Sequence, residues 1–144
     1  MTQLRLLHYP YVESDNLEDQ QGVEAHTDTG AFTILMQDDI SGLEIRARDG
    51  NWLAATPIED AFVINVGDMM QWWTAYRFIS TPHRVTNRSG RSRYSVPFFV
   101  NPDRSAVINQ LGVDPDDSGA KFEVGAHVEE AFVDAWPRDP TGVG

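Results

Sequence analysis

The chain has 144 residues, of which 41% are apolar and 23% are charged, and its net charge at pH 7 is -11. This length allows one domain with a hydrophobic core, and so acidic a surface repels phosphate backbones, which argues against a nucleic-acid partner. The absence of cysteine excludes disulfides and zinc–thiolate sites. No apolar run reaches the ~18 residues of a membrane-spanning helix and the start lacks a signal-peptide pattern, so we expect a cytoplasmic protein with no membrane partner.

Most of the chain predicts short strands separated by turn residues, which is typical of a β-sandwich or barrel. Asp49-Gly50 predicts a hairpin, and a polar loop is expected at residues 13–21. One or two helical turns fit residues 69–75. In chain order, the strands are expected at residues 4–9, 23–28, 31–36, 43–46, 52–54, 61–66, 83–86 and 94–100.

The C-terminal tail, residues 121–137, predicts an amphipathic helix that ends at Pro137 and covers one face of the sheets. Acidic residues alternate there with apolar residues at helical spacing. Many short strands followed by one helix favour a double-sheet jelly roll, which buries apolar side chains between its sheets and leaves a mouth for a ligand. The apolar positions of the tail are Val128, Ala131, Phe132, Ala135 and Trp136.

Two histidines and an aspartate form the strongest candidate site. His26 and Asp28 flank Thr27, and His83 lies far downstream in a Ser-Thr-Pro-His-Arg-Val segment. Side chains alternate along a strand, so His26 and Asp28 are expected on the same face. Two neutral imidazoles and one carboxylate cover one side of an octahedral metal and leave the other side open, as in non-haem Fe(II) enzymes that bind O2. Taken alone, a His-x-Asp pair also fits a surface or capping feature.

A second candidate site is the pair Arg93 and Ser95, which share a strand face. The guanidinium can donate two charge-assisted hydrogen bonds to a carboxylate, and the serine hydroxyl adds a third donor. The pair therefore fits a clamp for one end of a dicarboxylic acid on a strand next to that of His83. The alternative is a structural ion pair between Arg93 and one of the 22 acidic residues. His8 and His127 are expected to be structural.

As an ordered set, these motifs resemble the C-terminal catalytic domain of the Fe(II)- and 2-oxoglutarate-dependent dioxygenases, in the isopenicillin N synthase-like group. The likeness runs from about Leu4 to Ile108. The matching stretches are Leu4-Arg5-Leu6-Leu7-His8-Tyr9-Pro10, Gly22-Val23-Glu24-Ala25-His26-Thr27-Asp28, Gly30-Ala31-Phe32-Thr33-Ile34-Leu35, Asp49-Gly50-Asn51-Trp52, Asn65-Val66-Gly67-Asp68-Met69, Ser80-Thr81-Pro82-His83-Arg84-Val85 and Arg93-Tyr94-Ser95-Val96-Pro97-Phe98-Phe99.

The resemblance implies a mainly β fold, namely a double-stranded β-helix or distorted jelly roll with a short C-terminal helix. It implies that iron is held by His26, Asp28 and His83. It further implies that Arg93 and Ser95 bind the distal carboxylate of the cosubstrate 2-oxoglutarate. The implied reaction couples oxidative decarboxylation of 2-oxoglutarate to O2-dependent oxidation of a small organic substrate. Hydroxylation is the first expectation, and desaturation and cyclisation are also compatible with the sequence.

Two positions near the N-terminus refine the expected cosubstrate site. Tyr9 matches a tyrosine that commonly adds a hydroxyl contact to 2-oxoglutarate. Leu7 stands where plant members of the group often have an asparagine, so that additional polar contact is expected to be absent here.

Length is the main departure from the family pattern, because family members usually carry a long N-terminal region that braces the core. We expect a single catalytic domain over residues 1–144, with a core at about 4–108 and without that region. Sheet edges left exposed would favour self-association or contact with the missing region. Two alternatives remain: an inactive metal- or carboxylate-binding jelly roll, and an iron oxidase that does not use 2-oxoglutarate.

Overall fold

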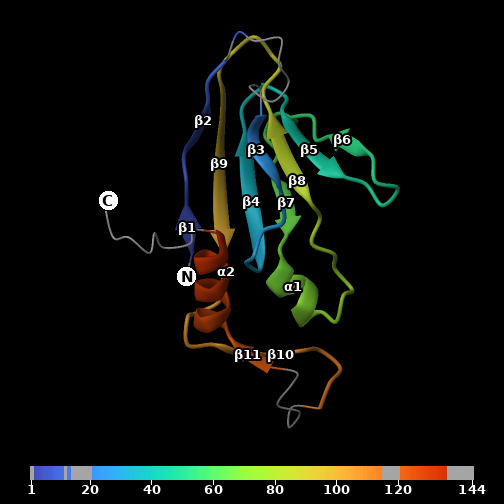
Figure 1. The fold of residues 1–144 in the computed structure, drawn as a ribbon, viewed down its shortest axis with the longest axis vertical. Coiled ribbons are helices and arrows are strands. Elements are labelled where there is room, and N and C mark those ends of the chain that lie inside the picture. Colours follow the sequence, from blue (N-terminus) through green and yellow to red (C-terminus); the bar gives the residue numbers. More distant parts are fainter. Residues whose placement is uncertain (1, 12, 14–20, 115–120, 136–144) are drawn as a thin grey trace.

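Two antiparallel β-sheets form the body of the computed structural model, which describes residues 2–11, 13, 21–114 and 121–135 (Figure 1). The major sheet is five-stranded and has the order β1-β9-β4-β7, with β2 also pairing with β9. The long strand β9 thus pairs with β1, β2 and β4 and joins distant parts of the chain. The strands are β1 (Gln3–Leu4), β2 (Leu7–Tyr9), β4 (Phe32–Gln37), β7 (Val63–Val66) and β9 (Arg93–Val100).

The minor sheet has four strands in the order β3-β8-β5-β6. Apolar side chains from both sheets pack between them, around the buried residues Tyr9, Leu43 and Val85. The expected mainly β jelly roll is therefore confirmed. The strands of this sheet are β3 (Gln21–His26), β5 (Leu43–Arg46), β6 (Trp52–Ala54) and β8 (His83–Thr86).

A second apolar cluster packs the first helix against the C-terminal elements. Met69 is fully buried beside Ile108 and Val124, and the rings of Trp72 and Phe122 have centroids 4.7 Å apart. Neither helix of the described chain is long and apolar enough to cross a membrane. The elements are α1 (Asp68–Trp73), β10 (Val107–Asn109), β11 (Lys121–Glu123) and α2 (Val124–Ala135).

The two faces of the major sheet differ in chemistry. Odd-numbered positions of β4 and β7 face the minor sheet and the core between the sheets. On the opposite face, Leu4 lies opposite Phe98, Phe98 opposite Ile34, and Ile34 opposite Ile64. Leu4 and Ile64 are 59% and 60% exposed. These four residues form an apolar row across four strands, which we call the outward apolar row.

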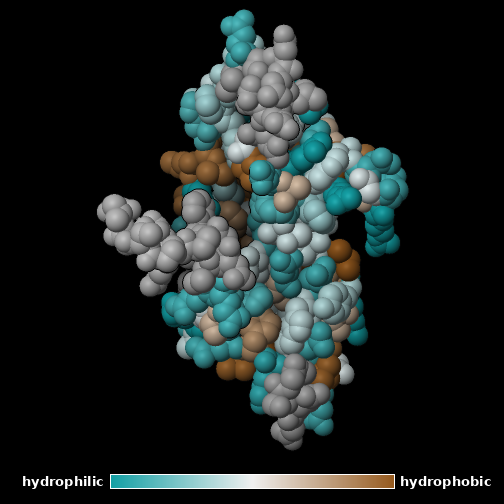
Figure 2. All heavy atoms as spheres, viewed as in Figure 1, coloured by the Kyte–Doolittle hydropathy of each residue, from teal (hydrophilic) through white to brown (hydrophobic). Residues whose placement is uncertain are grey.

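Further apolar side chains lie at the surface outside this row. Leu6, between β1 and β2, and Phe78, in the loop after α1, are both exposed. Figure 2 shows apolar surface along β2 and beside the loop after α1, within a mostly hydrophilic face. The described chain therefore exposes more large apolar side chains than its small core buries, which is typical of surfaces that contact other polypeptides.

Most predicted elements lie close to their expected positions. The strands at 43–46, 52–54 and 83–86 match β5, β6 and β8 residue for residue. The strand expected at 4–9 is interrupted between β1 and β2, because Pro97 of β9 has no N–H to donate. The Arg5 N–H still donates to the Pro97 carbonyl at 3.0 Å, so the register continues across the break.

The C-terminal tail differs from its prediction. Residues 121–123 form strand β11 instead of the first turn of the helix, because their backbone pairs with β10. The described helix runs from Val124 to Ala135, which confirms the expected short C-terminal helix. Strands β10 and β11 are not predicted from the sequence, since three residues are too few to show an alternating pattern. Most of the polar loop at 13–21, together with Trp136 and Pro137, lies outside the described residues.

Candidate metal centre

Strand pairing brings the two candidate histidines together. His26 at the end of β3 lies opposite His83 at the start of β8. Their imidazole rings have centroids 4.3 Å apart and are tilted by 54°. Residues 57 positions apart in the sequence therefore become neighbours through the register of a single strand pair.

Asp28 lies near the two histidines, as predicted, but the alternation of side chains along a strand is not the reason. Strand β3 ends at His26, so the period of a strand does not place the carboxylate. The Thr27 hydroxyl instead donates to Asp68 Oδ2 at 2.9 Å, and the Asp68 N–H donates to the Asp28 carbonyl at 2.7 Å. The backbone bond from Asp68 to Asp28 draws the chain away from β8 and toward α1. Asp28 Oδ1 then lies 3.8 Å from His26 Nε2 and 3.7 Å from His83 Nε2.

Hydrogen bonds orient both imidazoles toward the carboxylate. His26 Nδ1 is 2.8 Å from the Glu24 carbonyl, and His83 Nδ1 is 3.1 Å from the Thr81 carbonyl. A carbonyl oxygen can only accept, so each Nδ1 carries the proton and, in the neutral ring, each Nε2 keeps its lone pair. The three candidate ligand atoms lie within 4.8 Å of one another, as a shared metal ion requires.

The Asp28 carboxylate is held from its other side by the major sheet. Its Oδ2 accepts hydrogen bonds from Thr33 Oγ1 at 2.6 Å and from Asn65 Nδ2 at 2.7 Å. The Asp28 side chain is only 9% exposed, whereas that of His26 is 41% exposed. The centre is thus buried at the carboxylate and open toward His26. Nothing in the sequence pattern assigned a role to Thr33 or Asn65.

The backbone of α1 and its preceding glycine hold the loop that carries Asp28. The N–H of Gly67 donates to the Ala31 carbonyl at 2.9 Å, next to the bond from Asp68 to Asp28. A Cβ atom at Gly67 would lie 2.1 Å from the Gly30 carbonyl oxygen and 2.8 Å from that of Asp28. A residue larger than glycine therefore cannot occupy this position without moving the Asp28 loop.

The second candidate site is a buried guanidinium. Arg93 is completely buried and lies opposite Tyr9 in the β2–β9 pair. Its Nε donates to the Ile40 carbonyl at 3.2 Å and its Nη2 to Gln37 Oε1 at 2.8 Å, while Nη1 has no hydrogen-bond partner among the described residues. Within the described part of the chain, no carboxylate lies within salt-bridge distance of this group.

The surroundings of Arg93 favour an anionic ligand. Burial lowers the pKa of its guanidinium, and the nearby Tyr9 and Asp38 act in the opposite direction, but an arginine stays protonated at neutral pH. A buried cation with an unpaired N–H is costly unless a ligand supplies the missing acceptor. Ser95 is also buried and lies on the same strand face as Arg93, as predicted.

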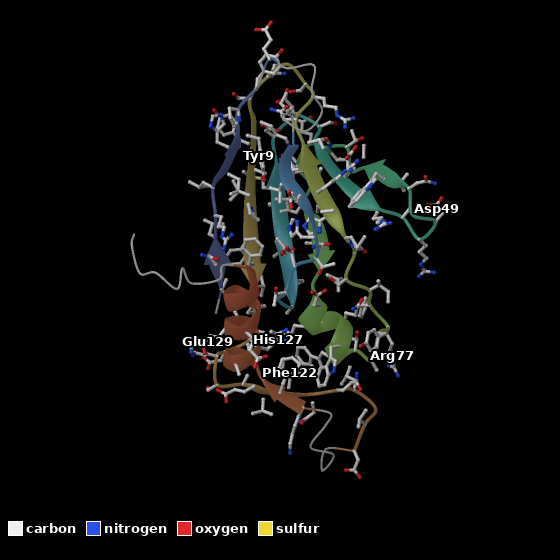
Figure 3. The ribbon with its side chains drawn as sticks, viewed as in Figure 1. Tyr9, Asp49, Arg77, Phe122, His127 and Glu129 are labelled. Carbon is white, nitrogen blue, oxygen red and sulfur yellow. The ribbon has the colours of Figure 1, made fainter. Side chains whose placement is uncertain are left out.

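The remaining histidines lie outside the triad. His8 stacks on Tyr94 with ring centroids 4.6 Å apart. His127 of α2 packs on Phe122 of β11 with ring centroids 4.7 Å apart, and Figure 3 shows this pair in the lower part of the molecule, far from Tyr9. These contacts agree with the expected structural roles.

An open groove elsewhere on the surface is separate from the histidine–aspartate triad and shares only Gln37 with the surroundings of Arg93 described above. It has a volume of about 680 Å³ and is lined by residues 36–39 and 57–62. Of the residues predicted to bind metal or cosubstrate, none lines it. The chemistry of the side chains therefore locates the candidate centre better than groove volume does.

Comparison with known proteins places the chain in a family. Residues 1–102 match the model of the 2OG-Fe(II) oxygenase superfamily, and the chain belongs to that superfamily. It is 46% identical over 104 residues to the 2-oxoglutarate-Fe(II) type oxidoreductase hxnY of Emericella nidulans, covering 69% of this chain and 30% of that protein. It is 41% identical over 125 residues to the rice homoarginine-6-hydroxylase 2-ODD-233, covering 83% of this chain and 38% of that protein.

Solved structures of the same kind share the fold. A full-length Neurospora crassa protein in complex with alpha-KG and thymine has a TM-score of 0.84 and 31% identity, over 94% of this chain and 44% of that chain. A 2OG-Fe(II) oxygenase family protein from Caulobacter crescentus has a TM-score of 0.79 and 34% identity, over 93% and 46%. The chain therefore spans less than half the length of these relatives.

The close approach at Gly67 generates a stability prediction. Gly67→Ala should lower the free energy of unfolding by ~1–3 kcal/mol, because the new Cβ overlaps the Gly30 carbonyl. It should also weaken Co(II) binding, since the Asp28 loop must shift. Urea unfolding and a Co(II) titration would measure the two effects.

Gly90→Ala is the matched control, because Gly90 has a positive φ but no atom near its Cβ position. Gly90→Ala should lower the free energy of unfolding through backbone strain alone, and its Co(II) affinity should be unchanged. Equal effects of the two substitutions on Co(II) binding would contradict the proposed coupling between Gly67 and the loop.

Proposed function

We propose that residues 1–144 are the catalytic domain of a 2-oxoglutarate-dependent non-haem Fe(II) dioxygenase. In this proposal His26, Asp28 and His83 hold the iron. The observation that carries it is the convergence of Asp28 Oδ1 with two Nε2 atoms at 3.7 and 3.8 Å, within a chain of the 2OG-Fe(II) oxygenase superfamily. The substrate is a small organic molecule, and hydroxylation is the first reaction to test.

The donor set fits a divalent ion. The imidazoles can present their Nε2 lone pairs without losing a proton, because their Nδ1 atoms already donate to carbonyl groups. Asp28 contributes one negative charge in a nearly buried position, where a cation offsets the cost of desolvating the carboxylate. The ion, when bound, supplies the redox chemistry by which O2 and 2-oxoglutarate yield succinate, CO2 and one oxygen atom for the substrate.

We propose that Arg93, Ser95 and Tyr9 bind the distal carboxylate of 2-oxoglutarate. The unpaired Nη1 of Arg93 is the donor that such a carboxylate would use. Charge-assisted hydrogen bonds are strong in a site that excludes water. Leu7 lies opposite Ser95 and packs into the core between the sheets, so it adds no polar contact there. The ligand is thus held at one end by charge, and its other end is free to reach the metal.

Removing the carboxylate at position 28 tests the metal site. Asp28→Ala should weaken Co(II) or Fe(II) binding at least ~100-fold, about 2.7 kcal/mol, because the only charged donor of the set is lost. Anaerobic calorimetric titration would measure the affinity. Asp39→Ala is the control, since Asp39 is an exposed carboxylate paired with Arg91. Unchanged affinity in the Asp28 variant would refute the ligand assignment.

Removing the guanidinium tests the cosubstrate site and the alternatives. Arg93→Ala should keep its metal affinity but bind 2-oxoglutarate at least ~30-fold more weakly, about 2 kcal/mol. Arg91→Ala, which removes an exposed arginine, should bind it normally. An assay of succinate formation would separate the candidate functions: O2 uptake without 2-oxoglutarate would favour an iron oxidase, and no turnover with any substrate would favour a binding module.

We also propose that the outward apolar row contacts other polypeptide, either a second copy of the chain or the further sequence that longer relatives carry. Exposed Leu4, Phe98 and Ile64, with the half-buried Ile34 between the last two, support this proposal. The isolated chain should then self-associate in light scattering at micromolar concentration, and Ile64→Lys should shift it to the monomer. Leu53→Lys, at an exposed position of the minor sheet, is the control. A monomeric unmodified chain would contradict self-association.

A further inference from the structure

The distal oxygen of Asp28 is held by two donors on different strands. Thr33 of β4 and Asn65 of β7 lie directly opposite each other in the major sheet. Both side chains point toward the minor sheet and reach the same atom, Asp28 Oδ2, at 2.6 and 2.7 Å. Thr33 is 5% exposed and Asp28 is 8% exposed, so water does not easily replace these bonds.

This arrangement makes the two carboxylate oxygens unequal. Oδ2 has both of its lone pairs directed at protein donors, whereas Oδ1 faces the two imidazoles. A carboxylate can bind a metal through one oxygen or through both. Here the second mode would require Oδ2 to give up two short hydrogen bonds, one buried and one partly buried, and such bonds are costly to break without replacement.

We propose that Asn65 and Thr33 are positioning residues that restrict Asp28 to binding the metal through Oδ1 alone. The proposal rests on the metal site proposed above. An octahedral ion with three protein donors keeps three positions for small ligands. Binding through both carboxylate oxygens would occupy one of these positions. Two would remain, which is too few for a two-atom chelate such as 2-oxoglutarate together with O2.

The sign of the effect separates positioning from simple electrostatics. Hydrogen-bond donors withdraw charge from a carboxylate, so an electrostatic effect alone predicts that the metal binds more tightly when a donor is removed. Positioning predicts weaker binding where the carboxylate becomes free to rotate away from the imidazoles, and a changed Co(II) spectrum where the freed Oδ2 joins Oδ1 as a second donor. The metal affinity and the Co(II) spectrum together therefore decide between the two.

The same loop offers a matched control. The Thr27 hydroxyl donates to Asp68 at 2.9 Å, a partly buried hydrogen bond that anchors the loop without touching the Asp28 carboxylate. Thr27→Val removes this bond and keeps the shape of the side chain. A general loss of loop stability would appear in this variant as well, whereas the loss of carboxylate positioning would not.

The experiment compares the full chain with Asn65→Leu, Thr33→Val and Thr27→Val, using Co(II) alone as the probe. Asn65→Leu and Thr33→Val should each raise the Co(II) dissociation constant ~10–100-fold and change the visible absorption spectrum of the bound Co(II). Thr27→Val should change the dissociation constant less than threefold. Thr33→Ser, which keeps the hydroxyl, should retain the original affinity and spectrum.

Each other outcome has a definite meaning. Tighter or unchanged Co(II) binding with an unchanged absorption spectrum in the Asn65 and Thr33 variants would overturn the proposal, as would an equal loss in Thr27→Val. Should Asn65→Leu fail to fold by circular dichroism, the comparison of Thr33→Val with Thr33→Ser decides the question in the same way. Failure of the unmodified chain to bind Co(II) would instead refute the metal site itself.

Discussion

A single buried carboxylate connects the two sheets of this protein. Asp28 Oδ1 faces His26 and His83 of the minor sheet, and Oδ2 is bound by Thr33 and Asn65 of the major sheet. The positions of the sheets therefore determine the geometry of the candidate centre, and the negative charge between them requires compensation that a cation provides.

The major sheet performs two tasks through the alternation of its side chains. Its inward positions carry Thr33 and Asn65, which bind Asp28, and the completely buried Arg93, which donates to Gln37 and to the Ile40 carbonyl. Its outward positions carry the outward apolar row. A sheet with one polar and one apolar face needs cover on both sides, and the minor sheet covers the polar face. The greater length of the relatives is consistent with this need.

Local sequence patterns predicted most of the fold and the candidate ligands, whereas the contacts between the two sheets could not be predicted from them. Strand periods located β5, β6 and β8, and residue types singled out His26, Asp28 and His83. The period argument failed at Asp28, because β3 ends two residues earlier and a long-range bond to Asp68 sets the turn. Thr33 and Asn65 could not be found by spacing, since their role depends on a register between β4 and β7 that no local pattern encodes.

An anaerobic crystal structure of the chain with Fe(II) and 2-oxoglutarate would test the central claim most directly. Our account predicts an anomalous iron peak within bonding distance of His26 Nε2, His83 Nε2 and Asp28 Oδ1, with Oδ2 still bound to Thr33 and Asn65. It also predicts the distal carboxylate of 2-oxoglutarate against Nη1 of Arg93. Iron bound elsewhere in a correctly folded chain, or a ligand carboxylate away from Arg93, would contradict it.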